Sequence, residues 1–171
     1  MAMSIAITGS RDLGSRSEAD VIGAFESFLL PFARAGVRWI LGGAAGIDTM
    51  ALDWLTGLDH PGGRLVVVPV TVADQPREAQ LAIEEAQGHG APVEVIELCH
   101  PSGSGPAAWT ARNQFMVDHC QLVIGFPASD LPDQSGTWET LEYARRCRRA
   151  LLTVPSSWPR RGQGPGRQRR G

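Results

Sequence analysis

The stretch Ile40-Leu41-Gly42-Gly43-Ala44-Ala45-Gly46-Ile47-Asp48 decides the fold. An apolar run over residues 37–41 stops at two glycines, and a third glycine and an aspartate precede a helix-like segment over residues 49–58. This order indicates a strand, a tight turn and a helix N-terminus. Helix N-termini expose unpaired backbone N–H groups with partial positive charge, and glycines let a ligand approach the backbone. The turn is therefore a candidate phosphate site, although it also fits an ordinary turn in which Asp48 caps the helix.

The spacing of these glycines does not match two common nucleotide motifs. It differs from the G-x-G-x-x-G pattern of dinucleotide-binding proteins, and no Gly-Lys-Ser/Thr follows, as a P-loop requires. The other segments of the chain must therefore decide between a ligand site and a plain turn.

Strand-like and helix-like segments alternate along the chain. The expected strands are residues 4–8, 37–41, 64–72, 92–98, 121–126 and 150–154, and the expected helices are residues 18–35, 49–58, 78–87, 107–119 and 136–148. Pro31 is expected to kink or shorten the first helix. The β-branched run over residues 65–70 is apolar on both faces, which is typical of a parallel strand covered by helices. The alternation predicts an α/β fold, a Rossmann-like three-layer sandwich with a mainly parallel sheet.

Length and composition indicate one globular domain over residues 1–154. The 171 residues contain 43% hydrophobic and 20% charged residues, and the formal net charge of -2 gives the whole chain no general attraction for nucleic acid. The charge is uneven, because residues 159–171 hold five arginines and no acidic residue. Residues 155–171, rich in Pro, Gly and Arg, are expected to form a disordered tail that can contact phosphates electrostatically.

Cysteine usage and hydropathy predict a cytoplasmic protein. Cys99, Cys120 and Cys147 are widely spaced, and no CxxC or Cys/His cluster suggests a metal site. The N-terminus does not match a signal peptide, and no apolar run approaches the ~20 residues of a membrane helix. The sequence gives no indication of a metal, a cofactor or a membrane partner.

Four short motifs are expected to meet at the carboxyl edge of the sheet, where ligands of such folds bind. They are Gly9-Ser10-Arg11, the turn over residues 42–48, Arg112-Asn113 and Ser135-Gly136-Thr137. Each alone fits a turn, a surface arginine or a helix cap. Together they supply hydroxyls, helix N-termini and guanidinium groups, which can bind a phosphate with two parallel hydrogen bonds.

The sequence resembles the SLOG superfamily of Rossmann-like proteins over residues 3–154. The residues that carry the resemblance are Ile7 to Arg11, Gly42 to Ala51, Arg112-Asn113 with Met116 and Asp118, and Ser135 to Thr137 with Thr140 and Ala144. This superfamily includes DprA-like DNA-processing proteins, cytokinin-activating phosphoribohydrolases and nucleotide-binding proteins of the YspA type. The resemblance implies a pocket for a nucleotide or nucleotide derivative.

The leading interpretation rests on the four motifs and gives the candidate site residues different roles. In the leading interpretation, a stand-alone domain binds a phosphate-bearing nucleotide as a small-molecule ligand. Backbone N–H groups of the glycine turn contact phosphate, Ser10, Arg11 and Thr137 add polar contacts, and Arg112 neutralises charge. The residues expected to bind the ligand are Gly9, Ser10, Arg11, Gly42, Gly43, Ala44, Gly46, Asp48, Arg112, Asn113, Ser135, Gly136, Thr137 and Thr140.

A hydrolase is the second interpretation. Phosphoribohydrolases of the superfamily cleave the N-glycosidic bond of a nucleoside monophosphate with an Arg, matched by Arg112, and a Glu in a Gly-Thr-x-x-Glu motif. Here that Glu position is Thr140, which has no carboxylate for such chemistry. Glu139 is adjacent but ~100° around the helix, so it is expected to point elsewhere. The departure weakens the enzymatic interpretation, although Glu139 or Asp48 can substitute.

Single-stranded DNA binding of the DprA kind is the third interpretation, ranked below a small nucleotide. The motif with Ser-Gly-Thr and a later Thr is closer to the DprA-like and YspA-like branches. Such binding uses a basic groove with interleaved aromatic side chains. Trp109 and Trp138 are expected near the pocket edge, where they can stack on a base or belong to the core. Apolar helix faces also permit a homodimer.

Overall fold

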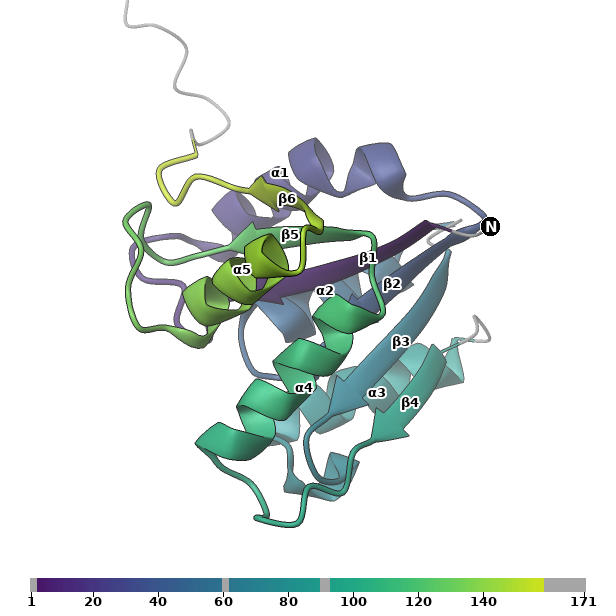
Figure 1. Cartoon of the computed structure of the whole chain (residues 1–171). Helices are drawn as coiled ribbons and strands as arrows, with labels where there is room; N and C mark the ends of the chain where they lie inside the picture. Colours follow the sequence, from purple (N-terminus) through teal and green to yellow (C-terminus); the bar gives the residue numbers. More distant parts are fainter. Residues whose placement is uncertain (1–2, 60–61, 90–92, 159–171) are drawn as a thin grey trace, which may run out of the picture.

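A computed structural model describes residues 3–59, 62–89 and 93–158. In these residues, six strands form one sheet in the order β4-β3-β2-β1-β5-β6, and every pairing is parallel (Figure 1). The strands are β1 (Met3–Gly9), β2 (Val37–Leu41), β3 (Gly63–Val68), β4 (Val93–Glu97), β5 (Leu122–Phe126) and β6 (Ala150–Thr153). The predicted α/β Rossmann-like fold is therefore confirmed.

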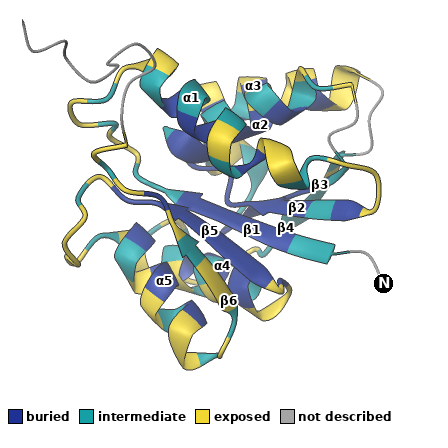
Figure 2. Ribbon diagram, turned by 90° about the horizontal axis from the view of Figure 1, so that it is seen from above, coloured by how far each residue is buried: buried dark blue, intermediate teal, exposed yellow. Residues whose placement is uncertain are grey.

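Helices cover both faces of the sheet (Figure 2). One face carries α1 (Glu18–Phe28), α2 (Ile47–Thr56) and α3 (Arg77–Gly88), and the other carries α4 (Pro106–Asp118) and α5 (Gly136–Arg146). Two short 3-10 helices, η1 (Leu30–Phe32) and η2 (Val72–Asp74), follow α1 and β3. No helix among the described residues combines the length and the apolar character that a membrane crossing needs.

Proline and a capping residue explain where several elements begin and end. Ser17 caps α1 in a capping box with Asp20, and the helix ends at Phe28, before Pro31 enters η1. The expected extension of this helix to residue 35 is wrong, while the expected shortening by Pro31 is confirmed. Strand β3 ends at Val68 rather than at residue 72, because Pro69 has no N–H to donate to a neighbouring strand.

The core consists of two apolar layers, one on each face of the sheet. Under α1 and α2, the rings of Phe25 and Phe126 meet edge to face at 5.2 Å, and both side chains are fully buried. Under α4 and α5, the buried side chains include Met116, Val123 and Leu141. Burial of apolar area on both faces stabilises the sheet and fixes the helices that carry the site.

The strand order reverses between β1 and β5. Strands β2, β3 and β4 are added one after another on one side of β1. The chain then crosses the sheet through α4, and β5 pairs with the other side of β1. The loops that follow β1 and β5 therefore lead to opposite faces of the sheet and leave a crevice between them. Ligands of open α/β sheets bind at such a switch point.

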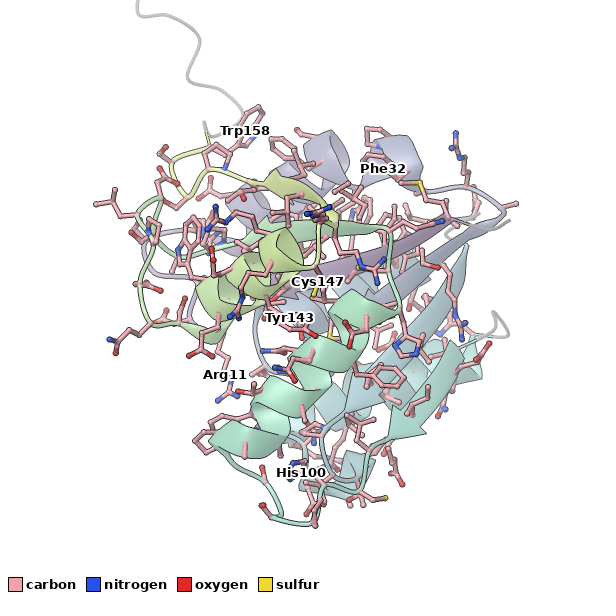
Figure 3. The ribbon with its side chains drawn as sticks, in the orientation of Figure 1. Arg11, Phe32, His100, Tyr143, Cys147 and Trp158 are labelled. Atoms are coloured by element: carbon pink, nitrogen blue, oxygen red, sulfur yellow. The ribbon has the colours of Figure 1, made fainter. Side chains whose placement is uncertain are left out.

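The segment after β6 packs against the body of the protein. The backbone N–H of Ser156 and the hydroxyl of Ser157 donate to Asp130, the latter at 3.1 Å. The ring of Trp158, labelled in Figure 3, meets the ring of Phe28 edge to face at 4.6 Å. The predicted disorder of residues 155–171 is therefore not seen for residues 155–158, and residues 159–171 lie outside the described residues.

Candidate functional site

A pocket of about 510 Å³ opens at the carboxyl ends of β1 and β5. Its wall takes residues from the loop after β1, the turn after β2, helix α4 and the start of α5, so it joins residues of all four predicted motifs. The predicted residues in its lining are Gly9, Ser10, Arg11, Ala44, Asp48, Arg112, Asn113, Ser135, Gly136 and Thr137.

A buried ion pair forms part of the pocket wall. Nη1 of Arg112 donates to the carbonyl of Gly42 and lies 3.8 Å from Oδ2 of Asp48, and the two residues are only 7% and 5% exposed. Burial lowers the pKa of Arg112, and burial raises the pKa of Asp48 to about 6 against the opposing charge of Arg112. Nε of Arg112 and Oδ1 of Asp48 are themselves buried and have no hydrogen-bond partner among the described residues, so the ion pair is held with part of its polar surface unpaired.

A second guanidinium stands at the mouth of the pocket. The exposed Arg11 places its Cζ 4.3 Å from the centre of the Trp109 ring, and Figure 3 shows Arg11 beside the N-terminal half of α4. The charge of Arg11 contributes to the lowered pKa of Arg112. One buried and one exposed positive charge at the same pocket favour an anionic ligand.

The opposite wall presents uncharged polar groups from the N-cap of α5, its first two turns and Asn113 of α4, and one acidic residue, Glu139. The hydroxyl of Ser135 caps the helix by accepting a hydrogen bond from the backbone N–H of Trp138 at 3.4 Å, and the buried residue Thr137 lines the pocket. The amide of Asn113 approaches Gly136 from α4. This wall offers hydroxyl and amide groups beside the positive end of a helix.

The three glycines of the turn after β2 do not line the pocket. The N–H of Gly46, expected to face phosphate, instead donates to Glu78 of α3 at 3.2 Å. A side chain at Gly42 would overlap Arg112 and Asp48, and one at Gly43 would press on Val68. The glycines allow close packing around the ion pair, and the pocket is formed by the side chains next to them.

The first turns of α5 differ from expectation at three positions. Thr140 is buried, donates its hydroxyl to the carbonyl of Gly136 at 2.6 Å, and does not line the pocket. Glu139, expected to point elsewhere, lines the pocket, because α5 buries Thr137, Thr140 and Leu141 and so turns residue 139 outward. Trp138 donates its indole N–H to the carbonyl of Ser129 at 3.2 Å and lies outside the pocket lining.

Several lining residues were not among the predicted ligand-binding residues. They are Thr8, Asp12, Pro106, Trp109, Thr110, Ala128, Gln134 and Glu139. The lining residues on α4 could have been predicted from the sequence, because residues 106, 109 and 110 are spaced by three and four from each other and from Asn113 and so share one helix face. Thr8 and Asp12 flank the Gly-Ser-Arg motif directly, but Ala128 and Gln134 lie in a loop without periodicity.

Comparison with solved structures identifies similar folds. The X-ray structure of DNA processing protein A (DprA) from Streptococcus pneumoniae superposes with a TM-score of 0.65 and 23% identity, over 90% of this chain and 50% of that one. DNA processing protein A from Helicobacter pylori, described for its single-stranded DNA binding mode, gives a TM-score of 0.63 and 20% identity, over 90% and 66% of the two chains. The chain thus spans between half and two thirds of these structures.

Sequence comparison gives the family. No curated protein matches the chain. The family model described as DNA recombination-mediator protein A matches residues 1–168, which is nearly the whole chain. On this match, and with a fold similar to two solved relatives, the chain belongs to the DNA recombination-mediator protein A family.

Proposed function

We propose that this protein binds single-stranded DNA and that the pocket holds a nucleotide unit of the strand, with its phosphate beside Arg11 and Arg112. One observation carries the proposal: the buried guanidinium-bearing residue Arg112 lines the pocket, while the exposed guanidinium of Arg11 stands at its mouth. Membership of the family and the DNA binding named for the Helicobacter pylori protein support DNA as the source of the phosphate. This ranks nucleic acid above the free nucleotide that the sequence alone favoured.

The size and lining of the pocket suit one nucleotide. Its volume of about 510 Å³ lies within the roughly 300–1,000 Å³ of small-ligand sites. Ser135, Thr137 and Asn113 can hydrogen-bond to a sugar or to the edge of a base. The ring of Trp109, at the mouth, adds an aromatic surface.

The charges limit how many phosphates the pocket can neutralise. Two arginines line it, and the formal net charge of the chain is -2. The logarithm of the binding constant falls linearly with the logarithm of the salt concentration, and we call the steepness of this line the salt slope. For single strands, each phosphate that is neutralised adds ~0.7 to the salt slope. We therefore expect a shallow salt dependence from residues 1–154, proposed to act as one domain, and a steeper one with the arginines of residues 159–171 present.

A free nucleotide is the second candidate, favoured by the carboxylates of Asp48 and Glu139, which both line the pocket. Carboxylates accept hydrogen bonds from ribose hydroxyls, and DNA has no 2′-hydroxyl. If Glu139 acts as an acid or base, this candidate extends to cleavage of the N-glycosidic bond. Release of free adenine from AMP would support that extension.

Binding of a fluorescent oligothymidylate tests the leading proposal. Arg11→Ala is expected to weaken binding about tenfold and to reduce the salt slope by ~0.7, because one phosphate contact is lost. Arg34→Ala is the matched control, since Arg34 is exposed and precedes β2 at the opposite edge of the sheet. Removing residues 159–171 should lower the salt slope without changing the effect of Arg11→Ala.

Two outcomes would contradict this proposal. The first is no binding of the oligonucleotide at low salt. The second is an equal loss of affinity in Arg11→Ala and Arg34→Ala, which would indicate general attraction by surface charge. Displacement of the oligonucleotide by AMP at concentrations that have no effect with dAMP would favour the second candidate instead.

A further inference from the structure

A second cavity of about 350 Å³ adjoins the pocket. Beyond the shared residues, its wall is formed by Ala45 in the glycine turn, by Asp74, Gln75 and Pro76, which connect β3 to α3, and by Ser104, which precedes α4. The two cavities share Arg11, Ala44, Trp109 and Arg112. They are therefore two lobes on either side of one boundary, which we call the first lobe (the pocket described above) and the second lobe.

The boundary between the lobes is the most cationic part of the site. Arg11 lies over Trp109 there, and Arg112 borders both lobes while it is only 7% exposed. An anion at the boundary would meet two guanidinium groups, and groups attached to its two sides would enter different lobes.

The second lobe has the chemistry of a nucleoside site without a free positive charge of its own. The carboxylate of Asp74 is already engaged, because the hydroxyl of Thr71 donates to it at 2.6 Å. The amide of Gln75 is fixed by donation from Nε2 to the carbonyl of Thr71 at 3.1 Å. Pro76 adds an apolar surface and Ser104 an exposed hydroxyl.

We propose, on the basis of the proposed function, that the two lobes bind two consecutive nucleosides of single-stranded DNA. The bridging phosphodiester lies at the boundary, beside Arg11 and Arg112. The first lobe takes one nucleoside against the start of α5, and the second lobe takes its neighbour against Gln75, Pro76 and Ser104. The minimal ligand is then a dinucleotide.

A variant that blocks only the second lobe tests its contribution to binding independently of the first lobe. Ser104→Trp places a large side chain in that lobe, and Ser104 is an exposed loop residue, so no core packing is lost. Ser102→Trp is the matched control, since Ser102 is exposed in the same loop and lines neither lobe. Both variants are made in the full chain.

The ligands are chosen to carry equal charge. The dinucleotide dTpdT and the 3′ and 5′ methyl phosphodiesters of thymidine each hold one diester, so they differ only in the second nucleoside. Each competes with a fluorescent oligothymidylate. With the unmodified protein, dTpdT is expected to bind about tenfold tighter than either methyl diester. In Ser104→Trp it should bind no tighter than the better methyl diester, and Ser102→Trp should match the unmodified protein.

The possible failures are distinguishable. Equal affinity of dTpdT and the methyl diesters for the unmodified protein would overturn the two-lobed site, and so would a dTpdT advantage that survives Ser104→Trp. Either result leaves the proposed function intact if the oligothymidylate still binds in an Arg11-dependent way. No binding of the oligothymidylate would overturn the proposed function and this inference together.

Discussion

Arg112 and Asp48 form a buried ion pair that packs against the backbone of Gly42. Nη1 and Oδ2 are 3.8 Å apart, and the guanidinium also donates to the carbonyl of Gly42. A residue with a side chain at position 42 would occupy the space of both charged groups. The absence of a side chain at one glycine thus determines how the arginine of the pocket is held.

Gly42→Ala is expected to destabilise the protein by roughly 1–3 kcal/mol, because an added methyl group forces buried neighbours to move. The shift of Arg112 should also weaken oligothymidylate binding. Urea denaturation and a binding titration measure the two effects. Gly23→Ala in α1 is the control, since a Cβ there meets no atom within 4 Å, and it should stabilise by about 0.5–1 kcal/mol. A Gly42→Ala variant as stable as the unmodified protein would contradict the packing described for this ion pair.

Asp48 is expected to make stability depend on pH. Its pKa is about 6 in the folded protein, above the ordinary value of 3.8, so the folded state holds the proton more tightly than the unfolded state. The resulting stabilisation is fully present below about pH 4, is lost as the pH rises through about 6, and amounts to about 3 kcal/mol.

Urea denaturation between about pH 4 and pH 7 tests this dependence. The difference in unfolding free energy between the unmodified protein and Asp48→Asn should change with pH in this window. Parallel curves for the unmodified protein and Asp48→Asn would show that Asp48 does not titrate in this range.

Glu139 is expected to oppose the binding of a DNA phosphate. Glu139 lines the same pocket as the two arginines, so its carboxylate would repel a phosphate bound there. Glu139→Gln removes this repulsion and should raise oligothymidylate affinity roughly threefold, which is the size expected for two charges several ångströms apart in water. Glu142→Gln is the control, because Glu142 pairs with Arg145 at 2.9 Å and is outside the pocket lining. Weaker oligothymidylate binding in Glu139→Gln, together with adenine release from AMP by the unmodified protein alone, would favour the hydrolase.

Trp158 is expected to stabilise the fold although it is 39% exposed. Its ring meets Phe28 edge to face at 4.6 Å, and such pairs contribute about 1 kcal/mol beyond their buried area. Trp158→Ala should therefore lower the melting temperature measurably. Leu131→Ala, at a side chain that is 75% exposed, is the control and should have little effect. Equal melting temperatures for the two variants would show that the Phe28 contact contributes little.

The sequence predicted the parts of the site that depend on short-range signals. Gly9-Ser10-Arg11, Arg112-Asn113 and Ser135-Gly136-Thr137 were expected at one sheet edge from the alternation of strands and helices, and all of them line the pocket. The hydrogen bond between Gly46 and Glu78 could not be predicted, because it joins groups 32 residues apart and depends on how α3 packs beside α2. Whether a glycine N–H is free is set by such tertiary contacts.

The orientation of α5 was the other unpredictable feature. The spacing of Thr137, Thr140 and Leu141 identifies an inward face, but the resemblance placed the functional position at 140 rather than at 139. Only the packing of the helix on the sheet shows that residue 139 reaches the pocket. The end of β3 at Val68, by contrast, was foreseeable from Pro69.

The position of β5 beside β1 also bears on when the protein becomes functional during folding. Gln121 donates its backbone N–H to the carbonyl of Ser4 at 2.9 Å, across more than a hundred residues of chain. Contacts of such sequence separation form slowly, because a long loop must close before they are gained. A newly synthesised chain that has formed only β1 to β4 would have the glycine turn but neither Arg112 nor the start of α5. Ligand binding would therefore report that the last third of the chain has docked, and could be used to time that step in refolding.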